Sequence, residues 1–429
     1  MAAVPTVLSQ VPELSQWIRP GDRVVCGQVA AEPLTLTRAL VAQREQLTGV
    51  EVFLGTMFSD TFAPAHADAL RFRSYGAMAR VGALARSGAL HVVPIHYSEI
   101  EPAFEQGALQ ADVVLVQMSA ERPGAGHSFG LAHDYVVAAA RRARVVIAEI
   151  NPEVPWTRGA EVPADFRIDV AVAANAAPVD IPTAPAGPTE TAIAALIAER
   201  IPDGAVLQTG LGSLPDAVLA GLGSHRDLGV HSGMIGDGVI ALIESGVVTN
   251  ARKNIDAGVS VTNLVAGTAR ARRHVDGNPA FRLAPAVYSH GAAVLAALER
   301  FHSINSALEV DLSGQVNAET LGGLSRGGVG GMNDFVRGAR RSPGGRSIIA
   351  LPATAARGQA SRIVPRLADG TVTVTRSDVD MVVTEFGVAD LRNCDLETRA
   401  QRLIAIAAPP FRDRLARALR EPGSWNPGN

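Results

Sequence analysis

The chain has 429 residues, of which 47% are hydrophobic and 19% are charged. This composition excludes a disordered or fibrous protein, and the length is sufficient for two or more domains with large cores. The formal net charge of −3 and the scattered basic residues exclude an electrostatic surface for nucleic acid or for an anionic membrane.

The cysteines and the N-terminus indicate a reducing compartment. Cys26 and Cys394 are too few for a disulfide framework and lack the spacing of a zinc site. The N-terminus has no basic segment followed by an apolar one, and no later run of about 20 residues is free of polar groups. We therefore expect a cytoplasmic protein. The ten histidines show no ligand spacing, so we expect no metal site.

Short apolar runs bounded by Gly, Pro or Asp recur along the chain, starting with Arg23–Cys26. Stretches rich in Ala and Leu at helical spacing lie between them, for example over 34–47 and 135–142. This alternation is typical of a parallel sheet covered by helices and predicts an α/β fold. The other runs are Val52–Leu54, His91–Pro94, Val113–Val116 and Val145–Ala148.

The two halves of the chain share a pattern. Ile-x-x-Gly-x-x-Val-x-x-Gly over 18–27 is echoed by Ile-x-x-Gly-x-x-Leu-x-x-Gly over 201–210, and a proline and an Ala/Leu helix follow each. Asp112–Met118 is likewise similar to Asp380–Phe386. Chance similarity among strand–turn–helix units is one explanation. We favour duplication of an α/β unit, which predicts two similar domains with a cleft between them.

The Pro- and Ala-rich segment over 181–188 carries few helix or strand signals and is typical of a linker. We therefore predict an N-terminal domain of residues 1–180, a linker over 181–190 and a C-terminal domain of residues 191–429.

Three loops of the second half are candidates for a ligand site. In the first, a strand is expected to run through Gly210-Leu211-Gly212 into a helix over 216–222, where backbone N–H groups favour phosphate. A dinucleotide fingerprint is excluded because Pro215 replaces its third glycine. In the second, over 230–238, the side chains of His231, Ser232 and Asp237 suit an active-site loop. A plain turn with Asp237 as helix N-cap explains that pattern equally well.

The third loop, over 325–335, has four glycines in five positions, at 327, 328, 330 and 331. Backbone that approaches a ligand closely, or that aims N–H groups at an oxyanion, needs glycine because a Cβ would block the approach. A flexible surface loop is the alternative. The chain has no Gly-x-Ser-x-Gly elbow, no Walker A motif and no metal-binding helix motif.

Several longer motifs are specific in combination. They are Asp112–Ser119, Glu149–Asn151 with Pro155, Gln208–Gly212, Ile304–Leu312, Gly328–Gly331 with Asp334-Phe335, Ser361–Pro365 and Val383–Arg392. Through them the chain resembles the acetyl-CoA hydrolase and 4-hydroxybutyrate CoA-transferase family along nearly its whole length. The resemblance implies two CoA-transferase-type domains, acyl-CoA bound at the cleft, and a homodimer or a dimer of dimers.

The resemblance also implies roles for single residues. Asn305 matches a position close to the reacting carboxylate, and Gly330 and Gly331 match the glycines that line the thioester and oxyanion region. A coenzyme A thioester is the implied substrate, a small carboxylate is a possible second one, and no cofactor is tightly bound. The residues that match the CoA-contacting loop are Gly210, Leu211, Gly212, Ser213 and Leu214.

One departure from the family is central. Its nucleophile is a glutamate in the segment His-(Ser/Thr)-Glu-Met, which attacks the acyl-CoA and then carries CoA as a glutamyl thioester. Here the segment reads His231-Ser232-Gly233-Met234, so the nucleophile's position has no side chain. A covalent cycle needs a group that leaves and returns, which positioning alone does not replace. Asp237 and Glu244 lie nearby but match positions where the family already carries an acid.

We therefore favour hydrolysis, or other non-covalent acyl-CoA chemistry such as cleavage of a 3-oxoacyl-CoA. A water activated by His231 or Asp237 would be the attacking group. The candidate catalytic residues are His231, Gly233, Asp237 and Asn305. One alternative is a genuine acyl-CoA:carboxylate CoA-transferase with a relocated nucleophile, and another is an acyl-CoA-binding paralogue without catalysis.

Overall fold

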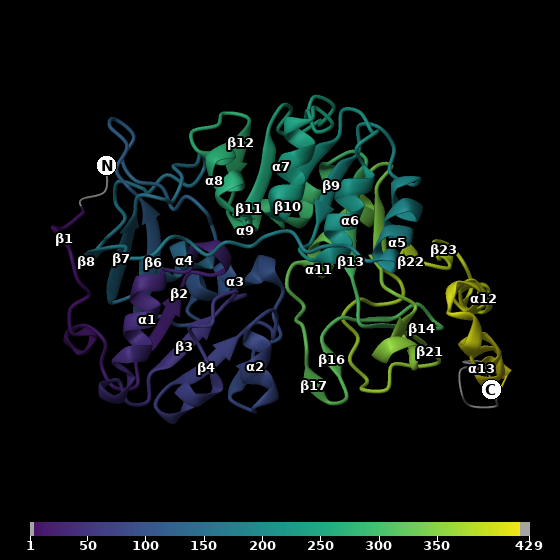
Figure 1. Cartoon of the computed structure of the whole chain (residues 1–429), viewed down its shortest axis with the longest axis horizontal. Helices are drawn as coiled ribbons and strands as arrows, with labels where there is room; N and C mark the ends of the chain where they lie inside the picture. Colours follow the sequence, from purple (N-terminus) through teal and green to yellow (C-terminus); the bar gives the residue numbers. More distant parts are fainter. Residues whose placement is uncertain (1–3, 421–429) are drawn as a thin grey trace.

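The computed structural model describes residues 4–420 and consists of two α/β halves that lie side by side (Figure 1). The first half contains short, buried strands that alternate with helices, as predicted. Its elements are β1 (Val7–Leu8), β2 (Arg23–Cys26), α1 (Leu34–Ala42), β3 (Glu51–Leu54), β4 (Arg71–Ser74), α2 (Val81–Arg86), β5 (Leu90–Val92), α3 (Tyr97–Gln106), β6 (Val113–Ser119), α4 (Tyr135–Arg142), β7 (Val145–Asn151) and β8 (Val170–Ala173).

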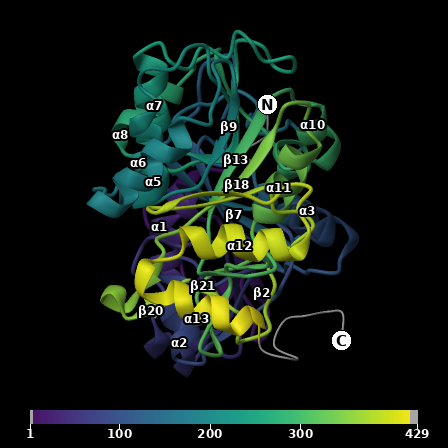
Figure 2. The same cartoon turned by 90° about the vertical axis from the view of Figure 1, so that its right-hand side faces the viewer.

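The second half is longer because small sheets and two C-terminal helices are added to its main sheet (Figure 2). Its helices are α5 (Pro188–Ala198), α6 (Ser213–Gly221), α7 (Asp237–Glu244), α8 (Ala269–Val275), α9 (Ala286–Ser289), α10 (Ala292–Ala297), α11 (Met332–Arg341), α12 (Leu396–Ile406) and α13 (Pro409–Arg420). Its main strands are β9 (Val206–Thr209), β10 (Gly229–Ile235), β11 (Ser260–Val265), β12 (Phe281–Leu283), β13 (Phe301–Ser306), β18 (Arg346–Ala350), β22 (Met381–Thr384) and β23 (Gly387–Asp390). The short strands are β14 (Glu309–Asp311), β15 (Val316–Asn317), β16 (Thr320–Leu321), β17 (Leu324–Ser325), β19 (Thr354–Ala355), β20 (Ala360–Ser361) and β21 (Ile363–Val364).

Each half is built on an eight-stranded sheet. The strand orders are β1-β8-β7-β6-β2-β3-β4-β5 and β12-β11-β10-β9-β13-β18-β22-β23. Neighbouring strands are parallel except for β22 and β23. The central strand β6 is buried along its whole length, as expected for a parallel sheet covered on both faces. The predicted α/β fold is confirmed.

The two sheets follow the same path. In each half one strand, β2 or β9, lies in the middle of the sheet, the next three strands extend the sheet on one side of it, and the chain then returns to its other side. The echo between 18–27 and 201–210 marks these two middle strands and is confirmed as a repeat.

The second predicted echo is wrong. Residues 112–118 run into β6 beside the middle strand β2, whereas residues 380–386 contain β22, two strands further out from β9 than β13. The similarity has a simpler cause, because each segment has an aspartate at the foot of a buried apolar strand. Asp112 pairs with Arg23 at 2.7 Å, and Asp380 pairs with Arg340 at 2.7 Å.

The segment predicted as a linker crosses between the halves as packed chain. The N–H of Ile181 donates to the carbonyl oxygen of Gly267 at 3.2 Å, and the N–H of Ala184 donates to the Asp216 carboxylate at 3.0 Å. Helix α5 begins at Pro188, inside the predicted linker, because proline suits the first helical position. The predicted division into domains stays a prediction, and its outermost residues, 1–3 and 421–429, lie outside the described residues.

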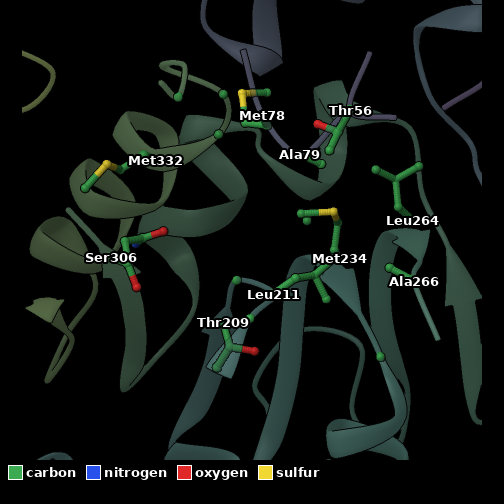
Figure 3. A pocket seen from close by; sticks show the side chains of 18 of the residues that line it. Thr56, Met78, Ala79, Thr209, Leu211, Met234, Leu264, Ala266, Ser306 and Met332 are labelled. Atoms are coloured by element: carbon green, nitrogen blue, oxygen red, sulfur yellow. The ribbon is translucent and has the colours of Figure 1, made fainter. Parts of the chain in front are cut away.

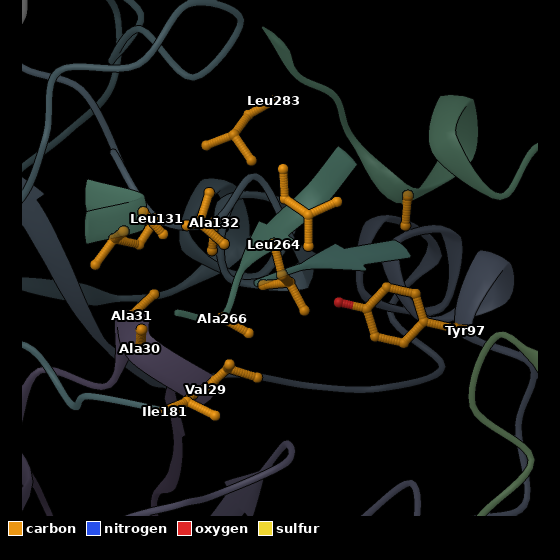
Figure 4. Close-up of a cluster of buried hydrophobic side chains, with 14 of the residues drawn as sticks. Val29, Ala30, Ala31, Tyr97, Leu131, Ala132, Ile181, Leu264, Ala266 and Leu283 are labelled. Carbon is orange, nitrogen blue, oxygen red and sulfur yellow. The ribbon is translucent and has the colours of Figure 1, made fainter. Parts of the chain in front are cut away.

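The two halves share one apolar core (Figure 4). Val29 and Leu131 of the first half and Leu264 and Leu283 of the second belong to the same cluster of buried side chains. Within residues 4–420, no helix is long and apolar enough to cross a membrane.

A chain of buried hydrogen bonds crosses this core. Gln28 Nε2 donates to Tyr97 Oη at 2.8 Å, and Tyr97 Oη donates to Asn263 Oδ1 at 2.9 Å. Asn263 Nδ2 then donates to the carbonyl oxygen of Ala284 at 2.9 Å. Buried polar groups are costly unless they are paired, so these bonds fix how the halves meet.

Helix α3 makes a second contact of this kind. The Glu101 carboxylate accepts a hydrogen bond from the N–H of Ala286, at the start of α9, at 2.8 Å. Burial raises the pKa of Glu101 to about 7, with hydrogen bonds from the α9 backbone acting in the opposite direction. The position of α9 therefore depends on a side chain from the other half.

Replacing Tyr97 by Phe removes the link between Gln28 and Asn263 and leaves the side-chain oxygen Oδ1 of Asn263 unpaired. We expect the free energy of unfolding to fall by about 1–3 kcal/mol. Tyr288→Phe is the matched control, because the Tyr288 hydroxyl donates to Asp256 in a half-buried position. Urea unfolding of Tyr288→Phe should show a smaller fall in the free energy of unfolding than that of Tyr97→Phe. An equal fall in the two variants would contradict the assigned role of Tyr97.

Glu101 also predicts a pH dependence of stability. Because its folded pKa of about 7 lies above the unfolded value of about 4.3, its contribution is present below pH 4.3 and is lost as the pH rises through 7. Glu101→Gln should therefore gain stability relative to wild type between pH 5 and about 8. Urea unfolding at both pH values measures this, with Glu99→Gln on the exposed side of α3 as control. A constant difference between wild type and Glu101→Gln would contradict the assignment.

Candidate active site

A cavity of about 570 Å³ lies at the carboxyl ends of β9, β10 and β13 (Figure 3). Strand β9 lies between the other two, and the strand order reverses there. The strands that follow β9 in the chain, β10 to β12, lie on one side of it, and β13 and the later strands lie on the other. Ligands of parallel α/β sheets bind at such switch points, outside the carboxyl ends of the strands. The topology therefore places a binding site where the described residues form a cavity.

Both halves line this cavity. The first half contributes apolar and hydroxyl-bearing side chains, among them Phe58, Met78 and Tyr97. The second half contributes the ends of its strands, with Gln208, Thr209, Met234 and Asn305, and the glycine loops. The ionisable side chains among the lining residues are Asp216, Asp237, His290 and the two tyrosines Tyr75 and Tyr97, and none of the lining residues is lysine or arginine.

The first glycine loop forms one wall. Gly210, Leu211 and Gly212 line the cavity, and Gly212 has a φ of +120°, which favours glycine. Helix α6 starts at Ser213 and not at 216 as expected, because the missing N–H of Pro215 falls in the first turn, where no helical partner exists. Ser213 and Leu214 lie in that turn and are not among the residues that line the cavity.

The third loop also lines the cavity, but its glycines are needed mainly for contacts within the protein. The Cα atom of Gly76, in the first half, lies 2.8 Å from where a Cβ of Gly328 would be, and the Ala318 carbonyl oxygen lies 2.1 Å from that of Gly327. Gly330 has open space around it and needs glycine for its φ of +47°. The loop is held in place, because the N–H of Ala77 donates to Gly327 O at 2.7 Å and the N–H of Tyr97 donates to Gly330 O at 2.9 Å.

His231 lies behind the cavity wall. Its side chain is fully buried within β10, its Nε2 donates to the carbonyl oxygen of Ser289 at 3.0 Å, and it is not a lining residue. Burial, with Lys253 as a second cause, lowers the pKa of His231 to about 3. The imidazole therefore supports the turn after α9 and does not face a ligand.

Gly233 lines the cavity beside a histidine that the sequence did not single out as a candidate. A Cβ at Gly233 would lie 2.8 Å from His290 Nε2, and a Cβ at Gly331 would lie 2.7 Å from the same atom. The imidazole of His290 packs against the rings of Tyr97 and Phe335, with centroid distances of 4.7 and 4.5 Å. The sequence gives little signal for His290, because it is a single histidine without a partner at a recognisable spacing.

Asp237 and Asp216 are lining residues whose carboxylates already have partners. Asp237 is the first residue of α7 and not its N-cap, which is Gly236. Its carboxylate accepts from Thr268 Oγ1 at 2.7 Å and from the N–H of the same residue. The Asp216 carboxylate accepts from Ala184, and partial burial raises its pKa. These carboxylates hold the walls of the cavity together.

Asn305 and Gln208 form a pair of amides at the ends of neighbouring strands. Asn305 Nδ2 donates to Gln208 Oε1 at 3.1 Å, and Gln208 Nε2 lies 3.3 Å from Asn305 Oδ1. Each amide keeps a second N–H that is not used in the pair. The two residues can therefore offer hydrogen bonds to a ligand without moving.

Within residues 4–420, no group of three or more histidine, cysteine, aspartate or glutamate side chains is arranged to hold a metal ion. The polar groups of the lining residues are amides, hydroxyls, two carboxylates, backbone groups and one imidazole.

Comparison with known proteins identifies the family. The chain matches the acetyl-CoA hydrolase/transferase N-terminal domain over residues 5–181 and the C-terminal domain of the same family over residues 267–419. It is 37% identical to the 4-hydroxybutyrate coenzyme A transferase of Clostridium kluyveri, and the alignment covers 93% of this chain and 94% of that one.

Solved structures agree with the sequence comparison. The structure of RipA from Yersinia pestis superimposes with a TM-score of 0.89 at 33% identity and covers 96% of each chain. The 4-hydroxybutyrate CoA-transferase from Porphyromonas gingivalis has a TM-score of 0.79 at 34% identity, with 95% of each chain covered. The predicted resemblance is confirmed, and the chain belongs to the acetyl-CoA hydrolase/transferase family of enzymes that act on acyl-CoA.

Proposed function

We propose that this enzyme hydrolyses acyl-CoA thioesters by direct attack of water, without a covalent enzyme intermediate. The observation that carries the proposal is Gly233, a cavity-lining position that has no carboxylate to attack the thioester. The space in front of it belongs to a cavity large enough for an acyl group and a water molecule.

The remaining walls suit an acyl-CoA. The loop of Gly210, Leu211 and Gly212 would contact CoA beside the start of α6. The backbone at Gly330 and Gly331 and the amide of Asn305 would donate to the carbonyl oxygen as negative charge develops on it. Such donors are typically worth roughly 10²–10³ in rate each, and they act on hydrolysis as well as on transfer.

A relocated nucleophile is not supported by the cavity walls. Among the lining residues, the carboxylates are those of Asp216 and Asp237, and each is already bonded to a neighbouring loop. Glu385 is not a lining residue of the cavity. Its carboxylate accepts a hydrogen bond from the N–H of Ala353. Water is the nucleophile that needs no rearrangement of these groups.

Release of CoA distinguishes hydrolysis from transfer. With butyryl-CoA the wild-type enzyme should release free CoA and butyrate, and addition of labelled acetate should give no labelled acetyl-CoA. Mass spectrometry follows both products, and intact-protein mass should show no CoA adduct. Labelled acetyl-CoA, or a protein adduct with the mass of CoA, would contradict the proposal and indicate a nucleophile elsewhere.

The absence of lysine and arginine from the cavity walls predicts selectivity for uncharged acyl groups. A carboxylate at the far end of the acyl chain would be buried without a cation, which costs several kcal/mol. We expect kcat/KM for butyryl-CoA to exceed that for succinyl-CoA by about 10²-fold or more, since 1.4 kcal/mol corresponds to a factor of ten. The monomethyl ester of succinyl-CoA is the matched control and should be hydrolysed better than succinyl-CoA. Equal rates for the acid and its ester would contradict this interpretation.

A further inference from the structure

We infer that His290, held by Ser289, is the general base that takes a proton from the attacking water. This inference rests on the proposed hydrolysis and assigns a catalytic residue to it. Four observations support it: the place of Nε2, the hydrogen bonds of the imidazole, its packing and its charge state.

The first observation is the place of the imidazole nitrogen. His290 Nε2 lies 2.8 Å from the position of a Cβ at residue 233, so the imidazole reaches into the room that a side chain at that position would need. Gly233 and His290 both line the cavity. A water molecule in the part of the cavity next to them would lie within hydrogen-bonding reach of Nε2.

The second observation concerns which ring nitrogen carries the proton. Ser289 Oγ lies 3.2 Å from the carbonyl oxygen of Pro285, four residues earlier, and 2.9 Å from His290 Nδ1. The carbonyl oxygen can only accept, so the serine hydroxyl donates to it and accepts from Nδ1–H. That arrangement leaves the lone pair of the neutral imidazole on Nε2, toward the cavity.

The third observation is that the imidazole is fixed from several sides. The rings of Tyr97 and Phe335 pack against the imidazole, and His231 donates to the carbonyl oxygen of the preceding residue, Ser289. Glu101 caps the start of α9, the helix that ends at Ser289. A base held in this way needs no reorganisation when substrate binds.

The fourth observation is that the imidazole is neutral. Burial lowers the pKa of His290 to about 3, and the neighbouring His231 acts in the same direction. The ionisable groups that contact its ring or shift its pKa are Tyr97 and His231, and neither is a cation at neutral pH. The lone pair is therefore free throughout the neutral range, and the imidazolium forms only while negative charge on the carbonyl oxygen offsets it.

The step balances without another reactant. The water oxygen bonds to the carbonyl carbon while one water proton passes to His290 Nε2, and the carbonyl electron pair moves to oxygen. When the tetrahedral adduct collapses, the C–S bond breaks and the CoA thiolate takes the proton from Nε2–H. The products are the carboxylic acid and the CoA thiol, and the imidazole is neutral again.

The test compares His290→Gln with wild type and with His302→Gln. His302 is a matched control, since it is buried in β13, donates through its ring to the carbonyl oxygen of Arg300 and does not line the cavity. We expect kcat for butyryl-CoA hydrolysis to fall about 100-fold in His290→Gln, near the lower end for general bases. Binding of S-butyl-CoA, a thioether that cannot be hydrolysed, should stay within about threefold of wild type by calorimetry.

Chemical rescue separates catalysis from structure. In His290→Ala, exogenous imidazole should restore kcat in proportion to its concentration and leave His302→Ala unaffected. If wild type releases no CoA, the proposed hydrolysis fails and the water-activating role fails with it. If wild type hydrolyses the thioester but His290→Gln retains full kcat, or imidazole does not rescue His290→Ala, only the assignment of His290 is overturned.

Discussion

Helix α3 holds the active site together, although it belongs to the half that carries none of the glycine loops. Its Tyr97 hydroxyl donates to Asn263 of β11, and its Glu101 carboxylate caps α9. At its start, Ser98 Oγ donates to Asp334 of α11 at 2.8 Å, and the N–H of Tyr97 donates to the third glycine loop. Three elements of the second half, β11, α9 and α11, and its third glycine loop are therefore positioned by one helix of the first. These hydrogen bonds restrict movement of the cavity walls, because a hydrogen bond in the protein interior is stronger than one in water.

The sequence was informative about elements whose signal is local. Buried runs such as Val113–Val116 and Val145–Ala148 form central strands, and the repeat at 18–27 and 201–210 contains the equivalent middle strands β2 and β9. Local patterns failed where tertiary contacts decide. The segment that begins at Asp380 resembled a repeat of 112–118, but its aspartate forms an ion pair with Arg340. Pro188 starts a helix inside a segment that was predicted to be irregular.

The site was predictable as a set of loops but not as a set of contacts. Gly210 to Gly212, Gly233, Asp237 and Asn305 all reach the cavity. His231 does not, because it lies two residues before Gly233 on the same face of β10, deeper in the strand, where its ring donates to the carbonyl oxygen of Ser289 behind the cavity wall. His290 could not be found from spacing, since its partners at 97, 233 and 335 come together only through the topology.

The glycines of the third loop determine how the two halves share the cavity wall. At Gly76 and Gly328 the backbones of the two halves cross with only hydrogen atoms between them, and Ala77 binds the same loop. The loop is thus covalently part of the second half but is fastened to the first. The wall that would meet the thioester is therefore built by the second half and held in place by the first.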